Sequence, residues 1–127
     1  MTIITITSLV ILCMGYTIYQ MKTSADANLE AYLTEPIVDI PTIITKMKLG
    51  KRITIDHGVY LIGSVYYGYY IHPTYVQIDD QDPILVSREQ YFYEEILQPK
   101  MKECGLNLKT LYKNDVGVLL SNSYAVE

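Results

Sequence analysis

The run at residues 2–21 reads TIITITSLVILCMGYTIYQM and contains no Asp, Glu, Lys, Arg or His. An α-helix rises about 1.5 Å per residue, so this run would cover about 30 Å, close to the thickness of the hydrocarbon layer of a bilayer. Its centre is apolar all round, whereas a helix lying in the interface keeps a polar face. The run therefore predicts a single-pass membrane anchor at residues 1–21, surrounded by the lipid bilayer. The central apolar residues are Leu9, Val10, Ile11 and Leu12.

The flank after this run has the residues expected at a membrane interface. Tyr16 and Tyr19 lie near its end, and Lys22 follows it. Aromatic rings collect at headgroup level, and a lysine there can extend its amine to water. Lys22 also favours a soluble domain that faces the cytoplasm, by the positive-inside rule. Cys104 agrees, because with Cys13 inside the run it has no intrachain partner, and an unpaired thiol suits a reducing compartment.

Two other interpretations of the run stay open. Ala25-Asp26-Ala27 has the small-x-small form of a signal-peptide cleavage site. Against it, no Lys or Arg precedes the apolar run, and Lys22 separates the run from that site. The β-branched residues at 2–7 could instead form a buried strand.

The rest of the chain is predicted to be a stalk and one domain. Residues 22–35 are rich in helix formers, and Pro36 disfavours helix at Glu35, so a helical stalk or linker should end there. Residues 36–127 leave room for one soluble domain. The net charge of −4 offers no electrostatic footprint for nucleic acid, so nucleic acid is not expected as a partner.

A helix is predicted between Asp39 and Gly50. Asp39 can cap it, Pro41 suits its first turn, and Gly50 ends it. Its apolar residues recur at helical spacing, and they are Ile40, Ile43, Ile44 and Met47.

Several strands should follow this helix. Ile53 and Ile55 alternate with polar residues, which is the period of a strand, and His57-Gly58 is expected to turn the chain. Further strands are predicted at residues 59–67, 69–72 and 75–78. Residues 84–86 are a short apolar run that follows a polar turn.

The last third of the sequence predicts a helix and a hairpin. Ser87-Arg88-Glu89-Gln90 has the form of a capping box, which predicts a helix from Arg88 through Leu97, kinked or restarted at Pro99. Residues 106–113 and 116–120 predict a hairpin that turns at Asn114-Asp115. The expected fold class is α+β: an N-terminal transmembrane helix, then one small domain with a mostly antiparallel sheet and two or three helices.

Two side-chain groups could carry chemistry. Asp79, Asp80 and Asp82 resemble the acids of a calcium site, but the required glycine and the distal acid are missing, so a plain acidic turn is favoured and no metal or cofactor is expected. Cys104 with His57 or His72 could form an activated thiol, which keeps a membrane-anchored enzyme as an alternative. No sequence motif supports that alternative, and catalytic residues are not assigned.

Four of the ten basic residues lie close together in the sequence. Lys46, Lys48, Lys51 and Arg52 form a cluster that would suit a solvated helix end or anionic lipid headgroups.

The 13 tyrosines, against one Phe and no Trp, are the most skewed feature of the composition. Tyr66, Tyr67, Tyr69 and Tyr70 are almost consecutive, so in a strand they must occupy both faces. One face can be core, and the other can present phenol rings to a partner.

These features together predict a function that involves protein–protein interaction. We expect a single-pass membrane protein whose soluble domain binds another membrane or membrane-associated protein, as an accessory or regulatory subunit. A structural subunit that self-assembles through its apolar N-terminal helix is the further alternative.

Overall fold

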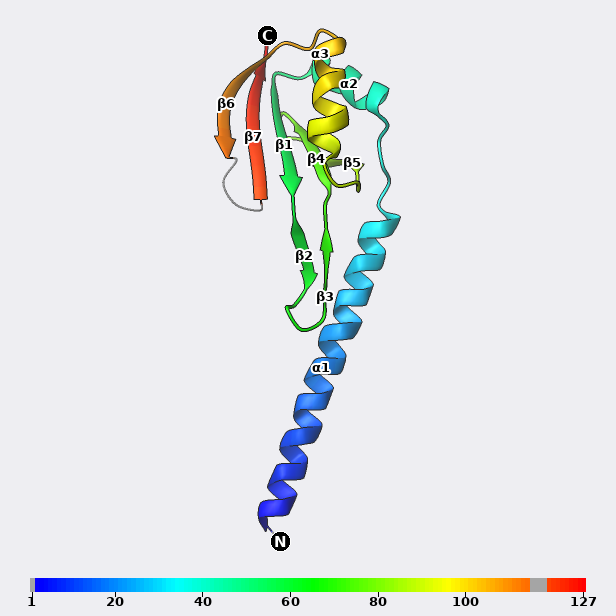
Figure 1. Cartoon of the computed structure of the whole chain (residues 1–127), viewed down its shortest axis with the longest axis vertical. Coiled ribbons are helices and arrows are strands. Elements are labelled where there is room, and N and C mark those ends of the chain that lie inside the picture. Colours follow the sequence, from blue (N-terminus) through cyan, green and yellow to red (C-terminus); the bar gives the residue numbers. More distant parts are fainter. Residues whose placement is uncertain (1, 115–118) are drawn as a thin grey trace. The chain divides into compact units, whose positions relative to one another are not determined.

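The computed structural model describes the backbone of residues 2–114 and 119–127 and the side chains of residues 15–114 and 120–127. Within these residues the chain forms a small α+β domain with a mostly antiparallel sheet and three α-helices, the last of which is preceded by a π-helical turn (Figure 1). The elements are α1 (Thr2–Thr34), α2 (Ile40–Leu49), β1 (Arg52–Gly58), β2 (Tyr60–Gly63), β3 (Gly68–Ile71), β4 (Thr74–Ile78), β5 (Ile84–Ser87), the π-helix η1 (Tyr93–Leu97), α3 (Gln98–Glu103), β6 (Leu108–Asn114) and β7 (Leu119–Val126).

These elements divide into two compact units. One unit comprises α1 and the segment Leu61–Tyr70. The other comprises Glu35–Tyr60 and Ile71–Glu127. Segment Leu61–Tyr70, called the tyrosine hairpin below, therefore belongs with the N-terminal helix and not with the domain that surrounds it in sequence.

The larger unit is built on a five-stranded sheet in the order β5-β4-β1-β7-β6. The pairs β1–β4, β1–β7, β4–β5 and β6–β7 are all antiparallel. Alternate residues of β1 are buried, as the period of two predicts. Ile53 lies opposite Ile78 and Ile55 opposite Val76, so facing strands contribute to one buried face.

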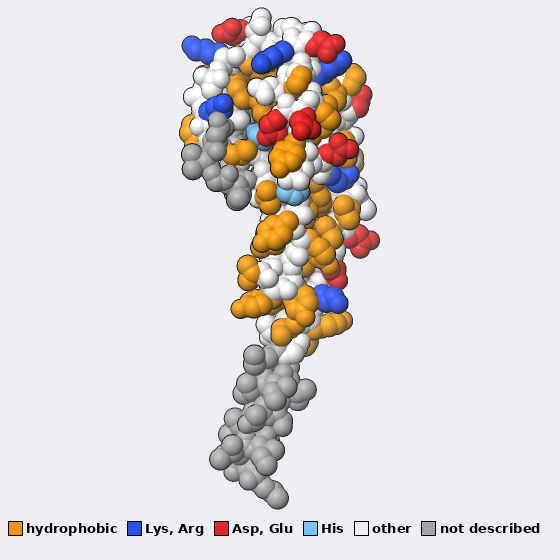
Figure 2. Space-filling view, viewed as in Figure 1, with side chains coloured by type: hydrophobic (Ala, Val, Ile, Leu, Met, Phe, Trp, Pro, Cys, Tyr) orange, Lys and Arg blue, Asp and Glu red, His pale blue; other side chains and the backbone are white. Residues whose placement is uncertain are grey.

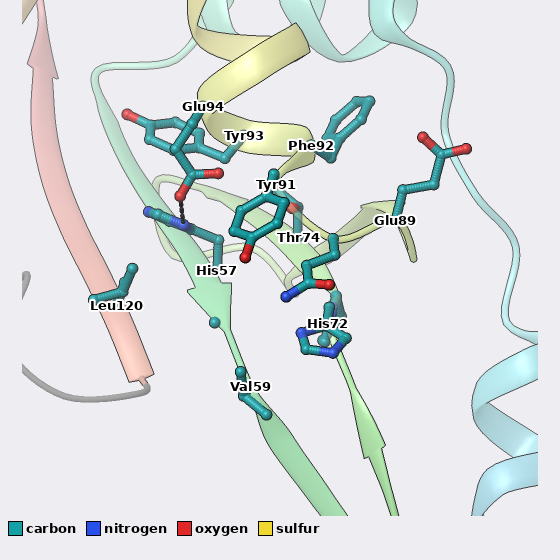
Figure 3. Close-up of a pocket in the computed structure, with 13 residues that line it drawn as sticks. His57, Val59, His72, Thr74, Glu89, Tyr91, Phe92, Tyr93, Glu94 and Leu120 are labelled. Atoms are coloured by element: carbon teal, nitrogen blue, oxygen red, sulfur yellow. Dashed lines mark ion pairs between the residues drawn. The ribbon is translucent and has the colours of Figure 1, made fainter.

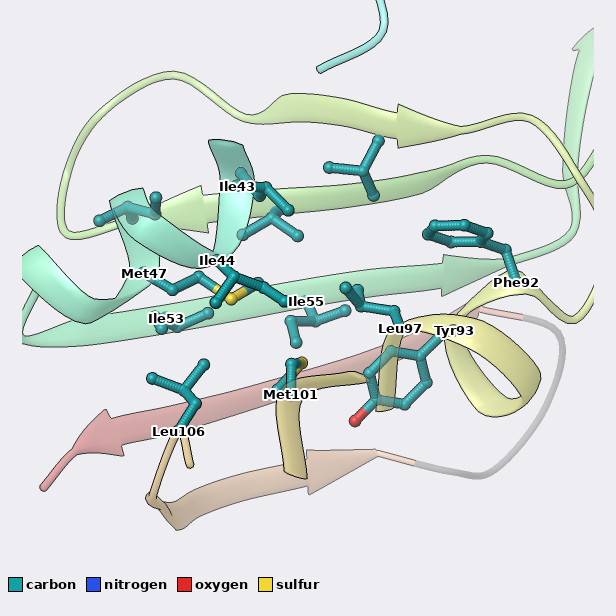
Figure 4. Packing of buried hydrophobic residues seen from close by; sticks show 13 residues of the cluster. Ile43, Ile44, Met47, Ile53, Ile55, Phe92, Tyr93, Leu97, Met101 and Leu106 are labelled. Atoms are coloured by element: carbon teal, nitrogen blue, oxygen red, sulfur yellow. The ribbon is translucent and has the colours of Figure 1, made fainter. Parts of the chain in front are cut away.

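Helices pack against this buried face (Figure 4). α2 begins after Asp39, carries Pro41 in its first turn and ends before Gly50, so its predicted bounds are confirmed, although the Asp39 side chain makes no capping hydrogen bond. Its apolar stripe meets residues of η1 and α3 in the core. The central members of the core are Ile43, Ile44, Met47, Ile53, Ile55, Leu97 and Met101.

The helix predicted from Arg88 is wrong in its first half. Ser87 lies in β5, opposite Thr74, and its hydroxyl accepts the N–H of Glu89 at 3.0 Å. Residues 88–91 are not helical, so this bond caps no helix. Tyr91 adopts φ 64°, which is outside the helical region. The helical segment begins only after Tyr91, as η1, and changes to α3 at Gln98, next to the restart predicted at Pro99.

Two strand predictions also need correction. His57 and Gly58 are the last residues of β1, so the predicted turn there is wrong. The strand predicted over residues 59–67 ends at Gly63, and Ser64–Tyr67 link β2 to β3. The antiparallel pairing predicted at the end of the chain is confirmed as β6 and β7, but β7 covers Leu119–Val126 and not residues 116–120, and Asn114 is the last residue of β6. Asp115 of the predicted turn lies outside the described residues.

Helix α1 ends at Thr34, directly before the predicted stop at Glu35-Pro36. The side chains of residues 2–14, which hold the central residues of the predicted anchor, lie outside the described residues. In the part of the chain that is described, no helix is both long and apolar enough to cross a membrane.

Candidate functional site

The larger unit contains a cleft of about 250 Å³ (Figure 3). The end of β1 contributes His57, and the segment that leads into β4 contributes His72 and Thr74. The opposite side comes from residues 89–94, which join β5 to η1. The sheet and the first turn of the helical segment thus form the two walls of the cleft.

A histidine–glutamate pair joins these two walls. His57 is only 8% exposed, and its Nδ1 lies 3.0 Å from Oε1 of Glu94. The imidazole also packs on the ring of Tyr93, with centroids 4.3 Å apart and planes inclined by 33°. Because Nδ1 faces Glu94 and Nε2 is buried, neither nitrogen is presented for proton transfer to a molecule in the cleft. The His57–Glu94 pair is therefore better placed to hold β1 and η1 together than to act as a general base.

Tyr91 stands at the mouth of the cleft in a strained conformation. Its φ of 64° is rare for a bulky residue, yet its side chain is 60% exposed and gains little from burial. The π-helix η1 begins two residues later. Positive φ at an aromatic residue and a single π-turn are both features that concentrate at functional sites.

The predicted thiol–histidine site is not assembled at this cleft. His57 and His72 both line it, whereas Cys104 is not among its lining residues. Cys104 is a free, partly buried thiol that packs against the hydrophobic core. Within the described residues no group of three or more His, Cys, Asp or Glu side chains could hold a metal ion.

The acidic turn after β4 has a structural task. Oδ1 of Asp79 accepts the backbone N–H groups of Lys51 and Arg52, at 2.9 and 3.0 Å. These two hydrogen bonds hold the pKa of the Asp79 carboxyl below its usual value, and the bond from Lys51 has the larger effect. The turn therefore fastens the end of β4 to the start of β1. All four residues of the basic cluster, Lys46, Lys48, Lys51 and Arg52, are exposed.

The tyrosine hairpin packs against α1 within the smaller unit. The Oη of Tyr69 donates to Oδ1 of Asp26 at 2.5 Å, and this hydrogen bond, together with the nearby negative charge, raises the pKa of the Tyr69 phenol. Tyr67 and Tyr69 line a depression with Lys22 and are each 39% exposed. Tyr66 and Tyr70 are 81% and 70% exposed. The exposed fractions divide the four rings into two pairs, but Tyr66 also lines this depression, and Tyr66 and Tyr67 lie in the link between β2 and β3, so strand alternation does not account for the pairs.

Comparisons with known proteins add no relative to these observations. No protein-family model, no curated protein and no solved structure matches the chain.

Glu94 and Tyr91 are parts of the cleft that the sequence does not indicate. The capping-box spacing of Ser87 and Gln90 predicts one regular helix that contains both residues. The only local signal of an aromatic site was the Tyr91-Phe92-Tyr93 triplet.

Proposed function

We propose that this chain is a single-pass membrane protein whose α+β domain binds another protein as an accessory or regulatory subunit. The anchor would be residues 2–21. Their lack of charge supports this, as does the unbroken backbone of α1, which is helical from Thr2 to Thr34. The soluble domain would face the cytoplasm, for which Lys22 is the sequence evidence.

The exposed, strained conformation of Tyr91 is the observation that supports partner binding most directly. An exposed tyrosine held at positive φ costs conformational free energy in the isolated protein, of the order of 1–2 kcal/mol. Tyrosine is enriched at interfaces because its ring buries a large area while its hydroxyl stays polar. A partner that covers this ring would turn the strained, exposed residue into a buried contact.

The charge around Tyr91 favours a basic segment on that partner. Glu89 and Glu94 line the same cleft, both with exposed side chains, and the whole chain carries a net charge of −4. Figure 2 shows acidic side chains gathered beside a histidine on this face. A lysine or arginine could meet a carboxylate and the tyrosine face together.

The experiment compares two exposed tyrosines in the full chain. The tagged protein is extracted from membranes in mild detergent, and co-purifying proteins are quantified for Tyr91→Ala and for Tyr112→Ala on β6, which is 58% exposed. If Tyr91 is a hot spot, its loss should weaken association by about 2 kcal/mol or more, while Tyr112→Ala has little effect. Tyr91→Gly, which tolerates positive φ, should lose the partner without losing thermal stability.

Equal capture by both alanine variants would contradict the assignment of Tyr91. Capture that falls only for Tyr66→Ala and Tyr70→Ala would move the partner surface to the tyrosine hairpin, as the sequence alone suggested. Mass measurement in mild detergent separates a foreign partner from self-assembly through the N-terminal helix.

Deleting residues 1–21 tests the anchor. The truncated chain should move from the membrane pellet to the soluble fraction. If it still pellets and resists a carbonate wash, the anchor is wrong. Cys104 reports the orientation, because a cytoplasmic thiol reacts with an impermeant reagent only after lysis.

A further inference from the structure

The tip of the tyrosine hairpin, Ser64–Tyr67, is a closed turn with two outward side chains. The N–H of Ser64 donates to the carbonyl of Tyr67 at 3.1 Å. The hydroxyl of Ser64 accepts the N–H groups of Tyr66 and Tyr67, at 3.3 and 3.2 Å. Three backbone donors are thus satisfied inside the tip, which lowers the cost of moving it out of bulk water. Val65 and Tyr66 project from it, each 81% exposed.

Close packing fixes the base of this tip on α1. A Cβ built on Gly63 would lie 2.8 Å from the Cβ of Ala25, and Ala25 is only 1% exposed. The hydrogen bond between Tyr69 and Asp26 joins the hairpin to the next residue of α1. The hairpin therefore has a defined level along the helix.

The position on α1 that the hairpin contacts is near the end of the uncharged run. Gly63 and Ser64 line a depression with α1 residues from Thr17 to Asn28, and the run ends within this stretch, at Met21. Tyr16 and Tyr19, on the same stretch of helix, are 64% and 66% exposed. One helical turn covers about 5.4 Å, so the tip lies within about a turn of the predicted interface.

The hairpin also has the composition of a membrane-interface segment. No Asp, Glu, Lys or Arg occurs between His57 and Ile78, so nothing in the hairpin carries the cost of placing a charge near lipid. Hydrophobic side chains gather over the hairpin and the adjoining part of α1 in Figure 2. Lys22 is the cation beside the hairpin, where it could reach phosphate.

We propose that this tip is a second membrane contact, in which Val65 and Tyr66 lie among the lipid headgroups beside the end of the anchor. The inference rests on the proposed anchor at residues 2–21. The contact would hold the hairpin and α1 against the bilayer surface, as interfacial aromatic residues do.

The absence of tryptophan from the chain provides the test. Tyr66→Trp introduces a single tryptophan at the tip, and Tyr112→Trp introduces one at an exposed strand position in the larger unit. Each full-length variant is reconstituted into phosphatidylcholine vesicles, with or without bromine on the acyl chains near the headgroup. We expect blue-shifted emission and strong bromine quenching for Tyr66→Trp, and neither for Tyr112→Trp.

The outcomes separate the tip contact from the anchor. Vesicles that float with the protein but leave Tyr66→Trp unquenched would overturn the tip contact alone. Failure of the protein to float would overturn the anchor and the contact that depends on it. A blue shift without bromine quenching would place Tyr66 against protein and would also overturn the proposal.

Discussion

Two residues other than glycine adopt positive φ, among those the structure describes, and their side chains have different surroundings. Asp79 has φ 52°, and its carboxylate fastens β4 to β1 through two backbone hydrogen bonds. Tyr91 has φ 64° and an exposed ring. Aspartate tolerates the left-handed region far better than tyrosine does. The strain at Asp79 is therefore offset within the fold, whereas the strain at Tyr91 is the basis of the proposed partner contact.

The Asp79 carboxylate should make stability depend on acid pH. Its pKa is lowered in the folded chain, so its contribution is fully present above the unfolded pKa of about 4 and is lost as the pH falls through the folded value. Asp79→Asn keeps the tolerance of positive φ but removes the charge. We expect a lower melting temperature at neutral pH and a smaller loss on acidification below about pH 4.

Asp80→Asn is the matched control for this prediction, because it removes the same charge from the neighbouring exposed position. Thermal melts of both variants between acid and neutral pH make the comparison. Identical melting curves for the two variants would show that the bonds to Lys51 and Arg52 add nothing.

At the scale of elements, the tyrosine hairpin depends on close backbone approach at one glycine. Gly63 has φ 100°, and an added Cβ would lie 2.4 Å from the carbonyl oxygen of Tyr67. Gly105, after α3, has φ 72° with no atom within 4 Å of such a Cβ. Both glycines therefore need a positive φ, but only Gly63 has no room for a side chain.

Gly63→Ala should release the hairpin from α1. The hydrogen bond from Tyr69 to Asp26 should weaken, so the raised pKa of Tyr69 should fall toward the usual value of about 10. An NMR titration of the tyrosine rings measures this change. Gly105→Ala should cost about 1–2 kcal/mol in backbone strain and leave the Tyr69 titration unchanged. An unaltered Tyr69 titration in Gly63→Ala would contradict the close approach.

At the scale of the whole molecule, one core stabilises the larger unit. The core joins α2, the sheet, η1 and α3, and none of its members comes from the described part of α1. Leu97 is fully buried there, whereas Leu111 on β6 is 52% exposed. Loss of core packing should therefore act on one unit and not on the other.

Leu97→Ala should destabilise the larger unit by about 2–5 kcal/mol, because it leaves a cavity in a close-packed core. Leu111→Ala should stay within about 0.5 kcal/mol of the parent chain. Chemical unfolding of the full chain in detergent gives these values, and hydrogen exchange locates them. Amide exchange should accelerate in β1, β4 and η1 and stay unchanged in residues 22–34. Equal acceleration in residues 22–34 would show that the two units unfold together.

Local sequence patterns determined most of the regular elements. The end of α1 follows from Glu35-Pro36, α2 follows from Asp39, Pro41 and its apolar stripe, and β1 follows from strict alternation. These signals are local because the backbone preference and the buried face of each element are contained in a few neighbouring residues. The candidate site is harder to predict from the sequence. Both of its histidines are candidates there, but nothing local indicates that Tyr91 and Glu94 lie in the same cleft.

Only the tertiary structure decided the remaining features. Pairing of Ser87 with Thr74 places the residue that would cap a helix in a strand, so the helical segment starts later and Tyr91 takes positive φ. Two further contacts join residues more than 35 positions apart in the sequence. They are the pair of His57 with Glu94 and the close approach of Gly63 to Ala25. The sequence determined most of the helices and strands. Where local signals allowed more than one structure, long-range pairing selected among them, because burial and hydrogen bonding between distant segments outweigh propensities of a fraction of a kcal/mol per residue.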